Sequence, residues 1–412
     1  MIKSHKLYYI FVIFLVLPVF FQLKNNIYTG QDIISKDLYF LPIPISFLSL
    51  FFFLILVQSN NFNLTNILKE KSVIVFLLCF FFIFAYQVFN YGLKSFKIIY
   101  LIQFYLPILG FLLGYFYYKP IFFFILYRVL LFFFLVHLSI SFISGKFILV
   151  ENLYFFSIYQ NFQYVNTTLI FLSVLTLIFI KDNVSKSSFL FFYFVSFFYS
   201  IFSYSLNSIF IYLIGTLIVF SNFYFAKKKN IILFIISIVI FFFSFASIKN
   251  EFSNFSFKGS DKKNHYLNTK KIDDILSFSM PQNINLRLEI WKIYLQEINK
   301  NKQILITGSK NFDLDKKYGS AHNLFLDIIY KFGLILTIPF FYLFYVIISK
   351  VFHEKKMYKK KIIIITLIFI VLENFFKVSL KQPYSGYLTY YILSIILLNK
   401  NFNKTISSKL FH

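Results

Sequence analysis

Long apolar runs constrain this chain more than any other feature of its sequence. The runs are each roughly 16–25 residues long, and a helix of about 20 apolar residues crosses the ~30 Å hydrocarbon core of a bilayer. Apolar residues make up 59% of the 412 positions, against about 45–50% in soluble domains. The sequence therefore predicts an all-α fold, a polytopic integral membrane bundle of transmembrane helices.

The apolar runs predict about twelve transmembrane helices. The predicted spans are 8–23, 39–57, 73–89, 98–118, 121–143, 166–180, 188–203, 208–224, 231–248, 324–349, 362–380 and 384–398. Residues 188–224 fit either a hairpin or a less regular arrangement, because their connection, SYSL, is very short. The chain then divides into an N-terminal bundle of about nine helices, a large external loop containing an amphipathic helix, and C-terminal helices with a cytoplasmic tail. These regions are 1–248, 249–323 and 324–412.

Lysine-rich loops give the chain a formal charge of +25. The lysines cluster between the predicted spans, and cytoplasmic loops of membrane proteins carry such an excess. This pattern predicts cytoplasmic N- and C-termini and argues against a nucleic-acid partner. In this orientation residues 144–165 and 249–323 lie outside the membrane on the opposite face. The only cysteine, Cys79, lies in an apolar run, so no intrachain disulfide is possible.

The stretch NINLRLEIWKIYLQEI, late in the large loop, carries apolar residues at helical spacing and predicts an amphipathic helix at the membrane surface. It contains Arg287, one of only two arginines, and Trp291, the only tryptophan, spaced i, i+4. The arginine fork binds phosphate oxygens in pairs, whereas lysine is a point charge. Arg287 is therefore a candidate anion ligand, with pairing to Glu289 or solvent as the alternative. Trp291 is more typical of an interfacial anchor.

The stretch GSAHNLFLDIIYKFG places His322 and Asn323 where the large loop meets the tenth predicted span. At this boundary an imidazole stays hydrated and titrates near neutral pH. Asp327 shares a helical face with Asn323, and an acid at that depth is costly unless it has a partner or faces a wet cavity. We expect this span to run without interruption through Gly333.

Charged residues within the predicted spans are further candidates. Arg128 lies near the middle of the fifth span and should face the bundle interior, since a charge there costs about 2.5–3.5 kcal/mol on insertion scales. Either Glu373 or a lipid-linked phosphate would be its partner. The i, i+4 spacing of Glu373 and Lys377 favours an ordinary helix ion pair, while Lys377 and Lys381 are also placed to form a basic rim for pyrophosphate. His137 is typical of a buried structural histidine.

Two glycines in GFLLG, Gly110 and Gly114, have the spacing that lets helices approach closely, and they predict packing inside the bundle. The sequence carries no P-loop, HExxH motif, dinucleotide-binding fingerprint in context or cysteine-rich cluster. We therefore predict no cofactor and no metal site.

A pattern of short motifs extends across the large loop and the next span. Its residues are Arg287 and Trp291 in NLRLEIW, Gly308 in LITGS, His322 and Asn323 in AHNLFL, and Gly333 in KFGL. This pattern resembles the C-terminal domain shared by O-antigen polymerases and O-antigen ligases, and the match covers residues 287–336. The chain departs from the family where Asn207 replaces an arginine and where 157–168 lacks one. It also has only Gly308 where the family often has Gly-x-Gly, and Leu336 where ligases tend to carry Gly, Thr or Tyr.

The resemblance implies a GT-C-like bundle in the bacterial inner (plasma) membrane, with one large late periplasmic loop. The implied reaction is glycosyl transfer from an undecaprenyl-diphosphate-linked oligosaccharide at the periplasmic face. The implied catalytic residues are His322, which takes the acceptor proton, and Arg287, which holds the pyrophosphate. The implied substrate-binding residues are Asn323, Arg128, Lys377, Lys381 and Trp291. Membrane lipid, a flippase and a chain-length regulator are the implied partners, and the reaction requires no metal.

Three functions remain open at this point. A repeat-unit polymerase, which extends another lipid-linked repeat unit, is favoured because weak motif retention suits enzymes that diverge with each glycan. An O-antigen ligase, which transfers the glycan to lipid A–core, is the alternative. A polysaccharide flippase or other polytopic transporter is a second alternative; Arg128 and Glu373 fit it, but the sequence shows no internal symmetry.

Overall fold

The structure is a computed structural model that describes part of the chain. The described residues are 2–17, 20–24, 40–44, 47–51, scattered positions between 74 and 89, 106–145, 149, 162–221 except 182 and 204, 282–309, 313–318, 320–354 and 357–398. The predicted span at 231–248 and the loop segment 249–281 lie outside these residues, as do parts of the predicted spans at 39–57, 73–89 and 98–118 and most of segment 144–165.

The described residues are helical apart from one two-stranded pair, so the expected all-α class is confirmed. The helices of the first half are α1 (Ile2–Val16), α5 (Leu109–Tyr117), α6 (Phe122–Ile143), α7 (Phe162–Ile180), α8 (Lys186–Phe202) and α9 (Leu206–Ser221), with the 3₁₀ turn η3 (Leu106–Ile108). The helices of the second half are α12 (Gln282–Lys300), α13 (Gln303–Thr307), α14 (Asp313–Tyr318), α15 (Leu324–Phe332), α16 (Leu334–His353), α17 (Met357–Phe376) and α18 (Pro383–Leu398), with the 3₁₀ turn η4 (Ser379–Lys381).

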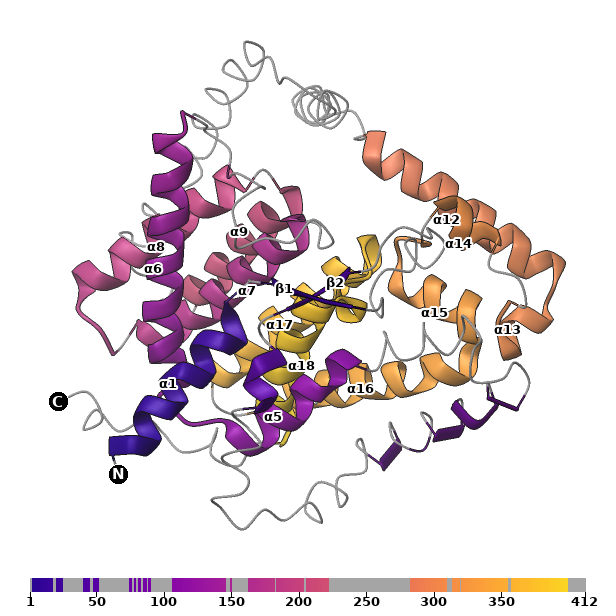
Figure 1. The fold of residues 1–412 in the computed structure, drawn as a ribbon, viewed down its shortest axis with the longest axis horizontal. Coiled ribbons are helices and arrows are strands. Elements are labelled where there is room, and N and C mark those ends of the chain that lie inside the picture. The colour runs from indigo at the N-terminus through magenta and orange to yellow at the C-terminus, as the bar shows by residue number, and fades with distance from the viewer. Residues whose placement is uncertain are drawn as a thin grey trace.

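One hydrophobic core joins helices from both ends of the sequence. Figure 1 shows α17 and α18 between the α6–α9 group and the α12–α16 group. Phe171 of α7 stacks on Phe369 of α17 with the ring centroids 4.0 Å apart. The last two helices therefore pack in the centre of the bundle, against the helices of the first half.

Two glycines bring α5 against α18. A methyl group on Gly110 would collide with the carbonyl of Tyr387, and one on Gly114 would collide with the carbonyl of Tyr391. Because neither glycine has a side chain, the two helix backbones come into direct contact. The packing role predicted for GFLLG is confirmed.

Helices α8 and α9 form a hairpin, which decides between the two arrangements that the short connection allowed. The hydroxyl of Tyr212 on α9 donates to the carbonyl of Tyr193 on α8 over 2.6 Å, and it also lies 3.1 Å from the hydroxyl of Ser196. Such polar links between apolar helices satisfy hydroxyls that burial would otherwise leave unpaired.

A second, smaller core lies in the second half of the described chain. Its buried side chains come from α12, α13, the segment before α15, and α15 itself. They are Tyr294, Ile298, Ile304, Ala321 and Tyr330. Helix α15 contacts both cores, because Leu324, Ile328 and Phe332 belong to the large one while Tyr330 belongs to the small one. The amphipathic helix expected around Arg287 is present as α12 and packs on α15 through this small core.

The predicted spans at 8–23 and 39–57 were wrong at the C-terminal end of the first and the N-terminal end of the second. Helix α1 ends at Val16, and residues Phe20–Lys24 form β1, which pairs antiparallel with β2 at Phe40–Pro44. Apolar content alone does not separate a strand from a helix. Pro42 and Pro44 lack amide hydrogens, which disfavours a helix interior but is tolerated in an edge strand.

The predicted uninterrupted span at 324–349 is also wrong. Helix α15 ends at Phe332, and Gly333 has φ 77° before α16 begins at Leu334. Glycine adopts this left-handed conformation without steric cost. The break separates a short helix that carries the polar residues from a longer apolar helix.

One helix in the described part of the chain, α6, is long and apolar enough to cross a membrane by itself. Six shorter apolar helices have 10–17 residues; they are Lys6–Val16, Leu106–Tyr117, Tyr164–Ile180, Lys186–Phe202, Asn207–Phe220 and Tyr384–Leu397.

Candidate functional site

His322 lies directly before α15 in an unusual backbone conformation. Its φ is 51°, the one positive φ of a non-glycine residue in the described chain. Histidine is among the residues that visit this region more readily, but the conformation persists only where surrounding structure imposes it. The next residue, Asn323, is the N-cap of α15, and its side-chain oxygen accepts the amide hydrogen of Leu326 over 3.1 Å. Asn323 therefore begins the helix, a structural role that explains its place beside the histidine.

Two glycines hold the preceding loop against the end of α15. Gly308, with φ 78°, lies where a methyl group would collide with the carbonyl of Lys331, and Gly333 lies in the same way against the carbonyl of Ile306. The amide of Ser309 also donates to the carbonyl of Tyr330 over 2.6 Å. The C-terminal ends of α13 and α15 are thus in backbone contact, which anchors both ends of the segment that contains His322.

Asp327 connects three parts of the site. Its carboxylate is buried and pairs with Lys331 one turn later, with Nζ 2.9 Å from Oδ1 and 3.0 Å from Oδ2. Lys381 of η4 approaches Oδ2 at 3.4 Å, and the amide of Ala321 donates to Oδ1 over 3.3 Å. A buried acid needs partners of this kind. The partner that the sequence required for Asp327 is present, and it includes Lys331, which we did not predict.

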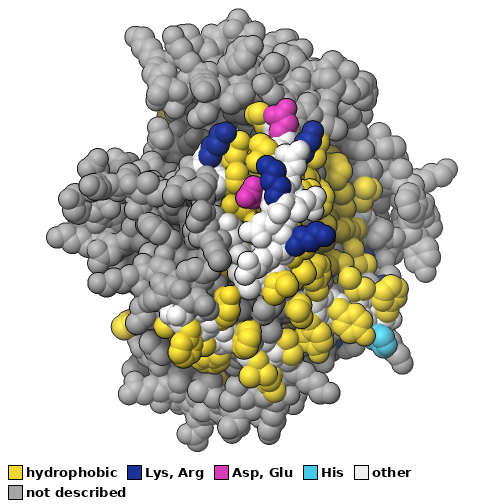
Figure 2. Space-filling model, turned by 90° about the vertical axis from the view of Figure 1, so that its right-hand side faces the viewer, with side chains coloured by type: hydrophobic (Ala, Val, Ile, Leu, Met, Phe, Trp, Pro, Cys, Tyr) yellow, Lys and Arg dark blue, Asp and Glu magenta, His cyan; other side chains and the backbone are white. Residues whose placement is uncertain are grey.

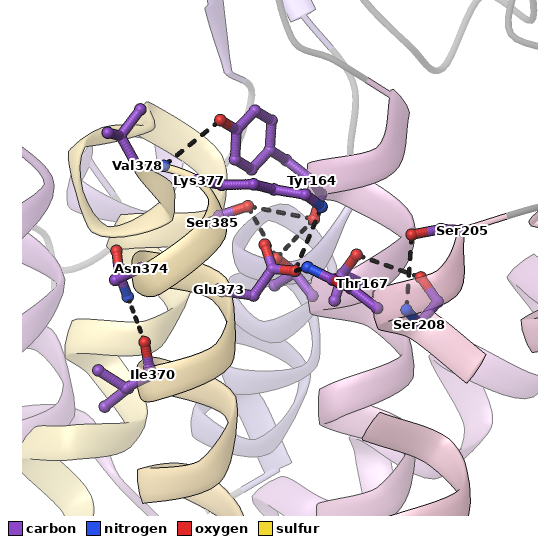
Figure 3. Close-up of polar contacts among 12 residues, drawn as sticks. Tyr164, Thr167, Ser205, Ser208, Ile370, Glu373, Asn374, Lys377, Val378 and Ser385 are labelled. Carbon is purple, nitrogen blue, oxygen red and sulfur yellow. Dashed lines mark hydrogen bonds and ion pairs between the residues drawn. The ribbon is translucent and has the colours of Figure 1, made fainter. Parts of the chain in front are cut away.

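Glu373 and Lys377 form the predicted i, i+4 ion pair, with Nζ 3.2 Å from Oε1. Asn207 of α9 donates its amide to the same oxygen over 3.0 Å, and Lys377 lies over the ring of Tyr164, 5.0 Å from the centroid. Figure 3 shows Tyr164 and Lys377 lying over Glu373, between α17 and α7. The amide of Val378 donates to the Tyr164 hydroxyl over 3.5 Å. Three helices therefore meet at one buried charged group.

Arg287 reaches the same region from α12. Trp291, one turn later, packs edge-on against Phe375 of α17 with ring centroids 5.1 Å apart. The Arg287 guanidinium is close enough to Glu373 and Tyr164 for their charges to act on its pKa. Burial lowers the pKa of Arg287, and the attraction of these two groups opposes that change. Trp291 fixes α12 on α17, so its position fits a packing role for the ring.

The positive charge of Arg287 also acts on His322. Burial lowers the pKa of His322 below its usual value, and the positive charge of Arg287 lowers it further. Asp327 opposes this change, while Lys381 and Lys331 add to it. The lowered pKa favours the neutral imidazole, which is the form that accepts a proton. The structure brings His322, Asn323, Arg287, Trp291, Lys377 and Lys381 together where α12, α15 and α17 meet.

Arg128 does not join this group, and the prediction that it faces the bundle interior was wrong. Its side chain is exposed on α6, with Nη1 3.4 Å from the Tyr9 hydroxyl and the guanidinium 4.4 Å from the centroid of the Phe124 ring. Glu373 has Lys377 and Asn207 as partners instead. Figure 1 shows α6 and α12 on opposite sides of the molecule. Helix α6 is apolar on every face, so its sequence gave no indication of which face turns inward.

His137 is buried as predicted, with Nδ1 3.1 Å from the Tyr199 hydroxyl. Tyr199 in turn donates to Asn166 over 2.8 Å. These residues belong to the bundle interior between α6, α7 and α8, and they hold helices together in the way that buried polar networks do.

Two residues of the site had no role assigned from the sequence. Lys331 stands four residues after Asp327, a spacing that identifies an ion pair once the helix is known. Tyr164 lies at the end of segment 144–165, which we predicted to be external. The sequence indicated only that 157–168 lacks the arginine common in the family, and it gave Tyr164 no role. Figure 2, which views the α12 side of the molecule, shows charged side chains gathered beside a broad hydrophobic area.

The site combines a neutral base with surplus positive charge. Its four cationic side chains face two carboxylates, so with His322 neutral it carries a net charge of +2. The cations are Arg287, Lys331, Lys377 and Lys381, and the carboxylates are Asp327 and Glu373. Within the described residues no group of three or more His, Cys, Asp or Glu side chains is arranged to hold a metal ion. The arrangement suits an anion next to a proton acceptor.

No family model matches the chain, and no curated protein matches it significantly.

Proposed function

We propose that this chain is a polytopic membrane glycosyltransferase with about twelve transmembrane helices in a GT-C-like bundle. Its helices carry large apolar side chains on their exposed surfaces, where the helices of a soluble protein carry mostly polar ones. Phe132 and Ile143 of α6 are 71% and 87% exposed, and Phe352 of α16 is 77% exposed. Lipid would cover such side chains. The proposed location is the bacterial inner membrane, with both termini in the cytoplasm and the charged site at the periplasmic face.

The proposed reaction is repeat-unit polymerisation. An undecaprenyl-diphosphate-linked glycan is transferred onto another lipid-linked repeat unit. The observation that carries this proposal is the convergence of Arg287 and His322, which come from different helices and are close enough for the arginine charge to lower the pKa of the imidazole. A diphosphate and an attacking hydroxyl must meet at such a place for glycosyl transfer to occur.

The chemistry of the proposed step assigns each group one task. An acceptor hydroxyl attacks the anomeric carbon and forms the new glycosidic bond, while the bond from that carbon to the diphosphate oxygen breaks. The diphosphate leaves with the electron pair, and His322 takes the proton of the hydroxyl. Arg287 stabilises the charge that grows on the leaving group, where its paired donors fit two phosphate oxygens.

The charge of the site supports a donor with a dianionic diphosphate, which gains a further negative charge as it leaves the sugar. A diphosphate bonded to a lipid and a sugar carries two negative charges, which balance the net +2 of the site. Lys381 is the lysine best placed to turn from Asp327 to the diphosphate. Its side chain is partly exposed, and its contact with Asp327 is longer than that of Lys331. Lys377 and Lys331 are more deeply buried and hold their acids.

Deletion of the gene in the source cells, followed by complementation, tests the proposal. A polymerase deletion leaves single repeat units on lipid A–core, whereas a ligase deletion leaves none. We expect single units, and a full-length gene should restore the ladder. His322→Ala should abolish extension, because it removes the imidazole that takes the proton of the attacking hydroxyl. His353→Ala, at an exposed position at the end of α16, is the matched control and should restore the ladder.

The outcomes of these experiments distinguish the polymerase from the ligase and from a transporter. Loss of all glycan from lipid A–core would replace the polymerase with the ligase. A ladder that persists in the deletion strain would contradict both enzymes and favour another polytopic function such as transport. A normal ladder with His322→Ala, at equal protein level in the membrane, would remove the imidazole from the mechanism.

A further inference from the structure

Asp327 is connected to the backbone around His322 as well as to two lysines. Its carboxylate accepts the amide hydrogen of Ala321, the residue directly before the histidine. The carboxylate is 2% exposed, so the groups that it contacts are its whole environment and solvent does not compete for it. The acid of α15 therefore holds the chain segment that precedes that helix.

Both neighbours of His322 are anchored to the first turn and a half of α15. Ala321 is bound by Asp327, and Asn323 caps the helix through Leu326. The amide of His322 itself donates to the hydroxyl of Ser320 over 3.2 Å. A left-handed backbone at a non-glycine residue costs roughly 1–3 kcal/mol unless its surroundings impose it. The two anchors supply that constraint.

We propose that Asp327 is a positioning residue that fixes the backbone and the protonation of His322 and does not itself touch the substrate. This role rests on the proposed function of His322 as the base. Asp327 fixes the backbone by accepting one hydrogen bond from the amide of Ala321, and it affects the protonation of His322 through its negative charge.

The charge effect has a defined sign. The groups whose charges act on His322 are Arg287 of α12, Asp327 and Lys331 of α15, and Lys381 of η4. The three cations disfavour the protonated imidazole, and Asp327 is the one group among them that favours it. Removing the Asp327 charge lowers the pKa of His322 further, whereas removing the Lys381 charge raises it.

A second ion pair offers an internal comparison. Glu373 and Lys377 have the same i, i+4 spacing and similar burial as Asp327 and Lys331. The further partner of Glu373 is Asn207 of α9, and its charge is not among those that act on His322. Glu373→Gln therefore removes a buried acid in the same way but leaves the histidine segment in place.

Labelling of His322 by diethyl pyrocarbonate tests the proposal without any glycan. The reagent modifies neutral imidazole, and mass spectrometry of the full-length protein in detergent separates the peptide with His322 from the other histidines. The pH midpoint of labelling reports the pKa, and the rate at high pH reports access. This experiment can succeed or fail regardless of whether the protein transfers sugars.

The two Asp327 variants should separate the two effects. Asp327→Asn keeps an oxygen for the Ala321 amide, so it should leave the high-pH rate near that of the wild type and lower the midpoint by about half a pH unit or more. Asp327→Ala loses the hydrogen bond as well and should raise the high-pH rate several-fold. Lys381→Gln should raise the midpoint, and Glu373→Gln should leave it unchanged.

An unchanged midpoint in Asp327→Asn, or an unchanged high-pH rate in Asp327→Ala, would overturn the proposal. If Asp327→Ala fails to fold, Asp327→Asn and Lys381→Gln still test the proposal, because it requires them to shift the midpoint of labelling in opposite directions. A Glu373→Gln variant that moves the midpoint as far as Asp327→Asn would show that any buried acid has this effect, and it would also overturn the assignment.

Discussion

The two arginines of this chain have opposite surroundings. Arg287 lies on α12 within electrostatic range of the buried acid Glu373 and of Tyr164, and burial lowers its pKa. Arg128 is exposed on α6 and contacts the Tyr9 hydroxyl and the face of Phe124. In the sequence Arg128 stands in the more apolar context, yet it is Arg287 that is surrounded by protein. The difference teaches that partners brought by other helices, and not the local sequence, decide whether a charge is buried.

Glu373→Ala should have the largest effect, because it removes the buried acid on the Arg287 side of this comparison. Lys377 would remain buried without its carboxylate, and breaking a buried pair in this way costs about 3–5 kcal/mol. Thermal unfolding in detergent, followed by fluorescence, measures the loss. Trp291 is the only tryptophan and packs beside this acid on Phe375, so the signal reports on the site. Glu289→Ala, an exposed acid on α12, should change the unfolding temperature little; equal losses would mean that Glu373 is not a buried partner.

Arg287→Lys should have the next largest effect, and it acts on activity. The charge stays, but the paired donors are lost, so we expect glycan extension to fall at least ~10-fold. The assay is the rate at which lipid-linked repeat units lengthen in proteoliposomes. Arg128→Lys is the matched control and should keep an extension rate within about two-fold of the wild type, because Arg128 lies on α6, on the opposite side of the molecule from α12. Equal losses from both substitutions would erase the distinction between the two arginines.

Tyr9→Phe should have the smallest effect. It removes the hydroxyl that Arg128 contacts at 3.4 Å, a distance at which a hydrogen bond is weak. We expect the free energy of unfolding to change by less than about 0.5 kcal/mol. A chemical denaturation curve with an unshifted midpoint would agree with this, whereas a shift as large as that of Glu373→Ala would place Arg128 in a stabilising network.

Much of the helical architecture could be predicted, because continuous apolar runs have few other solutions. The helices α6, α8 and α18 begin and end within a few residues of the predicted spans. The break at Gly333 was missed since the apolar pattern continues across it, and only the contact with Ile306 explains it. The strand pair β1–β2 was missed because FFQLK and FLPIP adjoin the apolar runs that predicted the first two spans.

The candidate site was predictable where a residue type was rare. Arg287 and Trp291 were identified because the chain uses arginine and tryptophan sparingly, and His322 because it stands where a polar segment meets an apolar run. Tyr164 could not be identified in this way, because the chain has 31 tyrosines. Its place beside Lys377 follows from the packing of α7 against α17, and such pairings between distant segments are not encoded in local spacing.

Gly308 lies against the backbone of Lys331 and Gly333 lies against that of Ile306, and these two contacts have a consequence for how the length of the segment between them can vary. These contacts join the two ends of the chain segment that contains α14, because a methyl group on either glycine would collide with the backbone at the opposite end. Extra residues inserted between α13 and α14 lengthen a loop whose ends are already joined, and closure entropy rises only slowly with loop length. Insertions between α13 and α14 should therefore leave His322 in place before α15, provided that both glycines stay.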